Sequence, residues 1–224
     1  MKRGGSYNHA CCGVVIIVGP GSKQKGIDMS ISIVGSGAIG SALAGHFAAK
    51  GVRVTIANQR GPASLAPIAE KYAPHVAPVE LKEALTADTI ILALPFSAIA
   101  GLASMTNWSG RTIVDATNAI NFTDFTAADL GGKSSSSLVQ ETLSGSQVVK
   151  AFNTIPAAIL AQTPEEGDGR RVVFLSGDNP DVRKDVAALI DDLGFAPMDL
   201  GSLQDGAPQQ CFHPLWAKNL ILKG

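Results

Sequence analysis

The chain of 224 residues is poor in the residue types from which several common kinds of site are built. Its three cysteines, Cys11, Cys12 and Cys211, are an odd number without metal-ligand spacing, which is typical of a reducing cytosol. Its four histidines form no cluster with carboxylates in the sequence. We therefore expect neither a zinc site nor a Ser/His/Asp arrangement.

An excess of charge of one sign is lacking as well. The formal net charge is −1, and the Lys and Arg residues are scattered along the chain. This pattern provides no surface for nucleic acid or for an anionic membrane. The apolar run from Cys11 to Val18 is far too short to span a bilayer, and no small-residue cleavage site follows it. We expect a cytoplasmic protein whose partners are small molecules.

The first residues look foreign to the fold that follows. Gly19-Pro20-Gly21 would break any regular element, and Met29 stands directly before the first clear strand. Met1 to Asp28 is therefore expected to be a poorly ordered leader or upstream-start extension. The alternative is an additional edge strand from Gly13 to Val18.

The most informative stretch is Gly35-Ser36-Gly37-Ala38-Ile39-Gly40. It follows the apolar run Ile31–Val34 and opens an amphipathic segment that continues to Lys50. A strand, a glycine-rich turn and a helix in this order form the phosphate-binding corner of a dinucleotide site. Gly35 permits the turn, Gly37 lets the backbone approach a pyrophosphate, and Gly40 lets the helix pack on its strand. The motif alone is weak evidence in a chain with 24 glycines, but its flanks favour a nucleotide over a purely structural turn.

The second predicted strand, Val52–Ala57, indicates which nucleotide is bound. It ends about 20 residues past the glycines, where a dinucleotide site reads the ribose. Asn58, Gln59 and Arg60 stand there, and no carboxylate is near them in the sequence to bind both ribose hydroxyls. A ribose phosphate would meet the Asn58 amide and the planar Arg60 guanidinium. We expect NADP rather than NAD; the alternative is that Arg60 is a solvated loop residue.

The rest of the chain alternates predicted strands and helices. This order is typical of a Rossmann-type α/β fold, doubly wound, with a mostly parallel sheet over residues 29–224 and a short C-terminal extension. Apolar runs predict buried strands at Thr89–Pro95, Thr112–Ala116, Gln147–Phe152, Arg171–Ser176 and Ala196–Leu200. Helical segments are expected over Gly61–Tyr72, with Pro67 in its first turn or at a kink, and over Pro78–Leu85, Phe96–Met105 and Pro180–Leu193. Ala119 to Ser137 is expected to be a long mobile or functional loop.

Several of these segments together resemble the NADPH-dependent deazaflavin-coenzyme (F-420) reductases. They are the glycine turn, Asn58-Gln59-Arg60, Leu92–Phe96, Val114–Asn118 and, most specifically, Val148–Thr154, which contains Lys-Ala-Phe-Asn-Thr. The resemblance covers Met29 to about the C-terminus. The cytosolic domain of the STEAP metalloreductases is similar, although those proteins continue into membrane helices. Gln209 to His213 departs from the glycine-rich pattern common in the family, which leaves the electron-accepting partner open.

The resemblance implies a set of cofactor-binding residues at the carboxyl ends of the strands, where open parallel sheets bind ligands. They are Gly35, Ser36, Gly37, Ala38, Ile39 and Gly40 for the pyrophosphate corner, Asn58, Gln59 and Arg60 for the 2′-phosphate loop, Leu94, Pro95 and Phe96 for the nucleotide crevice, and Asn118, Ala151, Phe152 and Asn153 near the nicotinamide. The alternative for Phe96 and Phe152 is a place in the core. The alternative for the two asparagines is the capping of turns.

The chemistry that the resemblance implies is hydride transfer between NADP(H) and a second redox molecule, a deazaflavin, a flavin or a similar small acceptor. Such a transfer needs alignment and exclusion of water more than an acid or a base, so we expect no catalytic residue. Hydroxyacid and imine reductases share the N-terminal signature but need a helical domain of more than about one hundred residues. A non-catalytic NADPH-binding sensor or interaction module remains the alternative.

Large apolar residues near the end of the chain predict a terminal helix with one apolar side. They are Phe212, Leu215, Trp216, Leu220 and Ile221. This side must be buried either on the chain's own sheet or on a partner chain, and a partner is favoured because crossover helices already cover the faces of the sheet. The family resemblance also implies pairing. We expect a homodimer through the C-terminal third, with the acceptor pocket near the interface.

Overall fold

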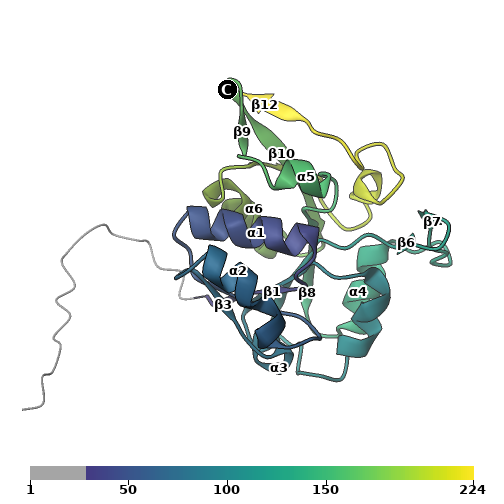
Figure 1. The fold of residues 1–224 in the computed structure, drawn as a ribbon. Helices are drawn as coiled ribbons and strands as arrows, with labels where there is room; N and C mark the ends of the chain where they lie inside the picture. Colours follow the sequence, from purple (N-terminus) through teal and green to yellow (C-terminus); the bar gives the residue numbers. More distant parts are fainter. Residues whose placement is uncertain (1–28) are drawn as a thin grey trace, which may run out of the picture.

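A twisted sheet runs through the middle of the molecule, which a computed structural model describes over residues 29–224 (Figure 1). The expected leader, Met1 to Asp28, and the alternative strand from Gly13 to Val18 lie outside the described residues. The main strands are β1 (Ile31–Val34), β2 (Val54–Ala57), β3 (Val76–Pro78), β4 (Thr89–Leu92), β5 (Thr112–Asp115), β8 (Gln147–Ala151), β10 (Gly169–Gly177) and β11 (Ala196–Asp199). Their order across the sheet is β11-β10-β8-β5-β4-β1-β2-β3.

The direction of the strands explains where a ligand can bind. From β3 to β8 all neighbouring strands are parallel. The chain moves outward from β1 to β2 and β3 on one side, and then crosses back to β4, β5 and β8 on the other. The order therefore reverses between β1 and β4, and such a switch point opens a crevice at the carboxyl ends of the strands. The predicted doubly wound Rossmann-type fold is confirmed.

Helices cover both faces of the sheet and complete two cores. One face carries α1 (Ala38–Ala49), α2 (Ala66–Lys71), α5 (Ala157–Leu160) and α6 (Pro180–Asp192), together with the 3-10 helix η1 (Pro62–Leu65). The other face carries α3 (Leu81–Ala84), α4 (Ser135–Thr142) and the 3-10 helix η2 (Phe96–Leu102). Phe47 of α1 and Ile91 of β4 are fully buried, and each such side chain contributes about 1.5–3 kcal/mol through burial.

Several predicted helices differ from the observed ones. Pro78 does not open a helix, because it ends the edge strand β3, where a proline costs few ladder hydrogen bonds. The segment from Phe96 to Met105 forms the 3-10 helix η2 rather than an α-helix, and its amides reach carbonyls three residues back, as Ala98 does to Pro95. Pro67 lies in the first turn of α2, one of its two expected places.

The predicted loop from Ala119 to Ser137 contains regular structure. It forms a hairpin of β6 (Ile120–Asn121) and β7 (Thr126–Ala127), which projects from the body beside α4 (Figure 1). Helix α4 then begins at Ser135, and the side chain of Ser134 accepts a hydrogen bond from the amide of Ser137 as its N-cap. The serine run, which the sequence predicts as the end of the loop, therefore forms the start of helix α4.

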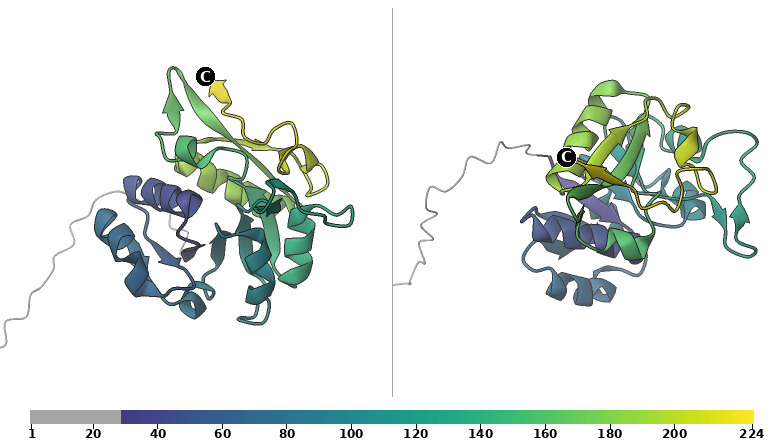
Figure 2. Two further views of the ribbon diagram at one scale, coloured as in Figure 1. Left: turned by 45° about the vertical axis from the view of Figure 1, so that its right-hand side comes forward. Right: turned by 90° about the horizontal axis from the view of Figure 1, so that it is seen from above.

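The C-terminal part differs most from the prediction. Strand β10 is antiparallel to β8, and its first half extends beyond the sheet with β9 (Glu165–Glu166) and β12 (Ile221–Lys223) as an arm, which Figure 2 shows from two sides. The predicted terminal helix is wrong. The segment consists of the 3-10 helix η3 (Ala207–Gln209), turns and strand β12. Pro214 interrupts the apolar stripe, and positive φ angles at Phe212 and Ala217 exclude a continuous helix.

Candidate functional site

The turn between β1 and α1 has the shape that an anion-binding turn requires. Gly35 has a φ of 118°, and a Cβ at this position would lie 2.1 Å from the carbonyl oxygen of Ala93. A Cβ on Gly40 would lie 1.9 Å from the carbonyl oxygen of Gly35. Gly37 differs from both, because nothing lies within 4 Å of its Cβ position. The first two glycines are needed by the fold, and Gly37 leaves its backbone open to a ligand.

The N-terminus of α1 is free to bind an anion. Gly37 is its N-cap residue without any side-chain hydrogen bond, and the first turn holds no acidic residue. The first amides of a helix have no partners within the helix, and the helix dipole makes this end positive. Phosphate groups are the common ligands of such a terminus. The turn therefore fits the pyrophosphate of a dinucleotide.

A cavity of about 340 Å³ opens beside this turn. The predicted residues that line it are Gly35, Ser36, Gly37, Asn58, Gln59, Arg60, Leu94 and Pro95, joined by Val34, Leu81, Ala93, Ala98 and Leu102. No carboxylate is among them. The cavity therefore pairs an apolar floor with an anion-binding rim, as the adenosine half of a nucleotide requires.

Asn58 connects the two loops at the rim. Its Nδ2 donates to the Oγ of Ser36 at 2.9 Å and to the Oγ of Ser64 at 3.0 Å. Its Oδ1 accepts from the backbone amide of Arg60 at 2.8 Å. Among the described residues the Arg60 guanidinium has no hydrogen-bond or ion-pair partner, and its side chain is exposed at the rim. Hydrogen bonds therefore fix the loop at Asn58, and the Arg60 guanidinium remains available to a ligand.

A second group of predicted residues comes together at the ends of β5 and β8. Asn118 Nδ2 donates to the carbonyl oxygen of Asn153 at 3.0 Å, and Asn153 Nδ2 donates to Asn118 Oδ1 at 3.2 Å. Asn153 Nδ2 also donates to the carbonyl oxygen of Gln209 at 2.7 Å. The two asparagines thus lie side by side, as expected from their places after neighbouring strands. Their role in cofactor binding stays a prediction.

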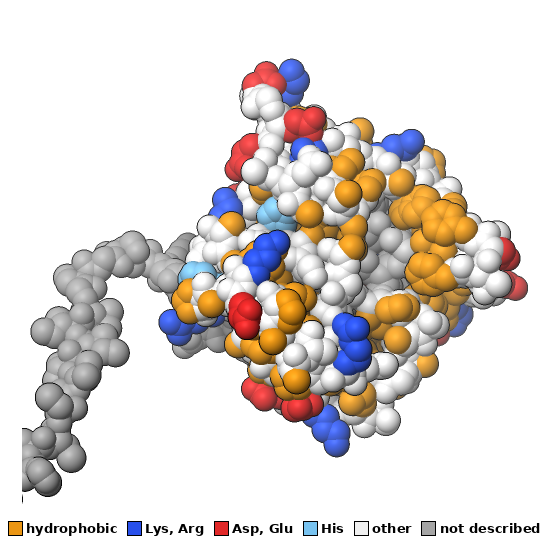
Figure 3. Space-filling model, in the orientation of Figure 1, with side chains coloured by type: hydrophobic (Ala, Val, Ile, Leu, Met, Phe, Trp, Pro, Cys, Tyr) orange, Lys and Arg blue, Asp and Glu red, His pale blue; other side chains and the backbone are white. Residues whose placement is uncertain are grey.

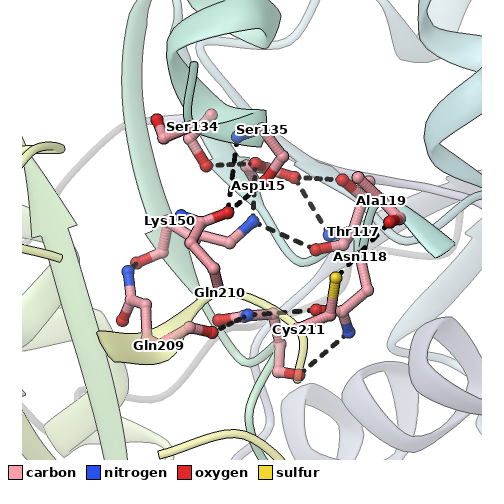
Figure 4. A network of polar contacts seen from close by, with 12 residues as sticks. Asp115, Thr117, Asn118, Ala119, Ser134, Ser135, Lys150, Gln209, Gln210 and Cys211 are labelled. Atoms are coloured by element: carbon pink, nitrogen blue, oxygen red, sulfur yellow. Dashed lines mark hydrogen bonds and ion pairs between the residues drawn. The ribbon is translucent and has the colours of Figure 1, made fainter. Parts of the chain in front are cut away.

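A buried ion pair lies near Asn118 in the same network of polar contacts (Figure 4). Lys150 Nζ is 3.0 Å from Asp115 Oδ2, and both side chains are fully buried. Asp115 also accepts hydrogen bonds from the Oγ of Ser136 and from the amide and hydroxyl of Thr117. Burial raises the pKa of Asp115, but Lys150 and these hydrogen bonds outweigh it and hold the pKa below its ordinary value.

The C-terminal segment Gln209–Cys211 adds further hydrogen bonds to this network. Gln209 Nε2 donates to the Oγ of Ser176 at 2.6 Å, Gln210 Oε1 accepts from the Oγ of Ser135 at 2.7 Å, and the Cys211 thiol contacts the carbonyl of Ala119 at 3.4 Å. Burial raises the pKa of the Cys211 thiol. The segment therefore packs across the carboxyl ends of β5 and β8 in Figure 4.

Aromatic rings gather next to the same segment. Phe212 lies 4.7 Å from Trp216 and 5.7 Å from Phe125 between ring centroids. Phe125, on hairpin β6–β7, is 59% exposed, and Phe212 is 43% exposed. In Figure 3 hydrophobic side chains gather on the side from which the hairpin projects. We call Phe125, Phe212 and Trp216 the aromatic cluster.

Backbone strain concentrates at this end of the molecule. The non-glycine residues with positive φ within the described part of the chain are Phe125, Phe152, Phe212 and Ala217. Two of them belong to the aromatic cluster, and Phe152 directly precedes Asn153. Each such residue costs about 1–3 kcal/mol, which the surrounding structure must offset, and such strain is frequent at functional sites.

Other predicted site residues do not line the cavity. Ala38, Ile39 and Gly40 form the first turn of α1, and Phe96 is half-buried against the second core. Ala151 and Phe152 have no exposed surface, and Phe152 packs edge to face on Phe195 at 6.2 Å. The Phe152 side chain is therefore a core residue, which was the alternative for it.

The sequence interpretation missed Ser64, Asp115, Lys150, Gln209 and Gln210. Two of these had a usable signal, because Asp115 and Lys150 are charged residues in strands that are otherwise apolar, and a buried charge needs a partner. Ser64 follows Gly61-Pro62 at the start of a helical segment. Gln209 and Gln210 carried no signal.

Within residues 29–224 no three His, Cys, Asp or Glu side chains are grouped as metal ligands. No helix in this described range is long and apolar enough to cross a membrane.

The fold and the site are those of a Rossmann-type dinucleotide-binding protein. A family model described as "NADP oxidoreductase coenzyme F420-dependent" matches residues 30–119, which include the glycine turn, the Asn58 loop and Asn118. Over these residues, which are fewer than half of the chain, the protein is similar to the NADP oxidoreductases of this family.

Similar proteins extend the match beyond these residues. A hypothetical protein from Sinorhizobium meliloti is 49% identical and covers 87% of this chain and 96% of its own, with a TM-score of 0.85. A putative F420-dependent NADP reductase from Arthrobacter sp. FB24 is 26% identical and covers 79% of this chain and 86% of its own, with a TM-score of 0.68. An imine reductase from Aspergillus terreus, at 20% identity and a TM-score of 0.58 over 78% of this chain and 55% of its own, shares the fold alone.

The curated relatives are longer proteins. Metalloreductase STEAP2 of Mus musculus is 29% identical over 182 residues, which are 78% of this chain and 34% of that protein. The chain thus spans about a third of the length of the curated relatives it matches.

Proposed function

We propose that this protein transfers a hydride between NADP(H) and a planar redox ring, a deazaflavin or a flavin. The observation that carries the proposal is the pairing of two features on the carboxyl-end side of the sheet. An anion-binding turn frames the cavity together with Arg60, whose guanidinium has no partner in residues 29–224, and the aromatic cluster lies beside the ends of β5 and β8. The family match supports the NADP half, and the name of the Arthrobacter protein supports the deazaflavin.

Different residues of the chain would bind different parts of the cofactor. The open backbone at Gly37 and the free amides of α1 would hold the pyrophosphate. Asn58 and Arg60 would hold the 2′-phosphate, since a guanidinium fork suits a phosphate dianion and no lining carboxylate repels it. The asparagine pair would lie at the nicotinamide end. When bound, NADPH supplies the hydride, and the chain contributes alignment and exclusion of water.

The aromatic cluster favours a planar acceptor. Exposed rings offer faces and edges on which another aromatic system stacks, and each such contact is worth about 0.5–1.5 kcal/mol. The positive φ angles of Phe125 and Phe212 show that the backbone is strained in order to place two of these rings.

A first experiment tests the cofactor. Arg60→Ala should weaken NADPH binding by about 1.5–3 kcal/mol, the range for a hydrogen bond to a charged group, and leave NADH almost unchanged. Isothermal titration with both nucleotides measures the difference. Equal losses for NADPH and NADH would show that Arg60 does not read the 2′-phosphate.

A second experiment tests the acceptor. Stopped-flow oxidation of NADPH is followed with the deazaflavin coenzyme F420, with FMN and with ferric citrate. Phe212→Ala should raise the KM for the ring acceptor by about 2- to 10-fold and leave the Kd for NADPH unchanged. Phe122→Ala is the matched control, because Phe122 lies on the same hairpin, is 69% exposed and makes no ring contact with the cluster. Reduction of ferric citrate alone would refute the ring acceptor.

A non-catalytic NADPH-binding module is the second candidate. The observation that favours it is the closure of the nicotinamide end, where Gln209 and Cys211 pack across the ends of β5 and β8. Tight NADPH binding without oxidation by any of the three acceptors would select this candidate.

A further inference from the structure

We propose that Lys150 is a positioning residue for the nicotinamide end of the site. Its ammonium joins the loop that carries Asn118 to the turn that carries Asn153, and so sets the surface against which the nicotinamide lies. This inference rests on the proposed function, because it assigns the asparagine pair to the cofactor. It concerns a residue that does not touch the cofactor itself.

The two charges are held opposite one another by the sheet. Asp115 is the last residue of β5 and is the register partner of Lys150 on the parallel strand β8. Both side chains are fully buried, so salt and water weaken the attraction between the two charges much less than they would at the surface. Its geometry is therefore set by two adjacent strands rather than by mobile surface side chains.

A contact beyond the ion pair gives Lys150 its role. Lys150 Nζ also donates to the carbonyl oxygen of Thr117 at 3.1 Å, and the next residue in the chain is Asn118. The same lysine precedes Ala151-Phe152-Asn153, and its own carbonyl accepts from Gln209 Nε2 at 3.5 Å. The Lys150 side chain thus holds the backbone directly before Asn118, while the Lys150 backbone, three residues before Asn153, is held by Gln209.

The turn after Lys150 requires such support. Phe152 has a φ of 63° although it is not glycine, and its side chain is fully buried. A strained backbone persists only where its surroundings determine it fully. Within the described part of the chain, Asn153 Oδ1 is buried without a hydrogen-bond partner, so this acceptor is not used in the internal network.

Stability alone does not account for the pair. Taking two charges out of water costs several kcal/mol per ion, and a well-packed apolar pair of similar volume is often as stable or more stable. If Lys150 positions the site, the defect caused by losing its side chain should persist when Asp115 is neutralised as well. If Lys150 only balances the charge of Asp115, neutralising both residues should remove the defect.

The test uses the full chain and probes that separate the two ends of the cofactor. Lys150→Met should leave the Kd for 2′,5′-ADP, which lacks nicotinamide, within about threefold of wild type. The fluorescence lifetime of bound NADPH should shift toward that of the free nucleotide, since the ring is less constrained. Hydride transfer to the best wild-type acceptor should slow by about 10- to 100-fold at saturating NADPH, as misplacement of a reacting group predicts.

A double variant keeps the test valid if Lys150→Met unfolds. Asp115→Asn with Lys150→Met buries no unpaired charge, so it should fold, but it still lacks the bond to the Thr117 carbonyl. We expect it to keep the lifetime and rate defects. Recovery of both to wild-type values would overturn the inference, because charge balance would then be the whole role.

Arg171→Met is the matched control for loss of a buried cation. Arg171 is 4% exposed and donates to the carbonyl of Thr163 and to Asn219 in the arm, away from the asparagine pair. It should lower the melting temperature without changing the NADPH lifetime. An equal lifetime change in Arg171→Met would also overturn the inference. A wild-type protein without any NADPH signal would instead refute the proposed function, and the inference with it.

Discussion

Replacing Gly37 with alanine separates the glycine that a ligand needs from the glycines that the fold needs. Gly37 has a φ of −72° and a ψ of −169°, which alanine adopts without strain, and its Cβ position is open for 4 Å around. Alanine is a poorer N-cap than glycine but restricts the unfolded chain, and these effects are similar in size. The free energy of unfolding should change by less than about 1 kcal/mol.

Binding should respond much more strongly than stability. The new methyl group would stand where the backbone amides meet the pyrophosphate. Losing one hydrogen bond to a charged group costs about 1.5–3 kcal/mol, which corresponds to a rise in the NADPH Kd of about 10- to 150-fold.

Gly35→Ala and Gly40→Ala should behave in the opposite way. Their Cβ atoms would lie 2.1 Å and 1.9 Å from backbone carbonyl oxygens, so main chain must move. Overpacking and, at Gly35, a positive φ together cost about 2–6 kcal/mol, or a fall in melting temperature of more than about 4 °C.

Thermal unfolding and isothermal titration with NADPH measure both quantities for each variant. Gly101→Ala is the control, because its Cβ position is also open and it does not line the cavity. It should change neither quantity. A Gly37→Ala protein that binds NADPH within about twofold of wild type would refute the assignment of the pyrophosphate to this turn.

Three further predictions concern the rim, the helix layer and assembly. Ser64→Ala removes one hydrogen bond that holds Asn58, so it should weaken NADPH binding by about 0.5–1.5 kcal/mol and leave NADH binding unchanged. An equal loss for both nucleotides in a titration would contradict this prediction. His46 donates from Nε2 to the Leu160 carbonyl at 2.5 Å, and burial lowers its pKa. His46 therefore contributes stability that is present above its ordinary pKa of 6.5 and is lost as the pH falls toward the lowered pKa. In His46→Gln the melting temperature should lose that pH dependence between about pH 7.5 and 5.5, and an unchanged profile would assign it to another group. The homodimer through the C-terminal third stays a prediction, which light scattering at micromolar concentration tests; Trp216→Glu should yield a monomer, and a monomeric wild type would refute the dimer.

The first half of the fold is readable in the sequence because local and global signals agree there. Ile90–Leu92 is apolar throughout and all of β4 is buried, and the glycine turn follows a strand and opens a helix as the motif requires. Asn118 and Asn153 could be brought together in advance, since both follow parallel strands that end at one edge.

The second half depends on contacts that no local pattern encodes. The apolar spacing from Phe212 to Ile221 fits a helix, yet Ile221 pairs with Arg171 in a strand that is distant in the sequence. The antiparallel direction of β10 is likewise decided by packing on β8 and β11. Pro214 argues against a continuous helix in the segment from Phe212 to Ile221. The charges of Asp115 and Lys150 in apolar strands indicate an ion pair, because a buried charge requires a partner.

The network around the asparagine pair includes residues from the last part of the chain to be synthesised. The cavity around the glycine turn is built from residues 34–102, all in the first half of the chain. The hydrogen bonds that close the other end join residues that are 56, 75 and 92 positions apart, such as Cys211 to Ala119. Chains fold from the N-terminus as they are made, and contacts of long sequence separation form late. The end of the site that holds the asparagine pair is therefore completed only after the C-terminal segment has been made.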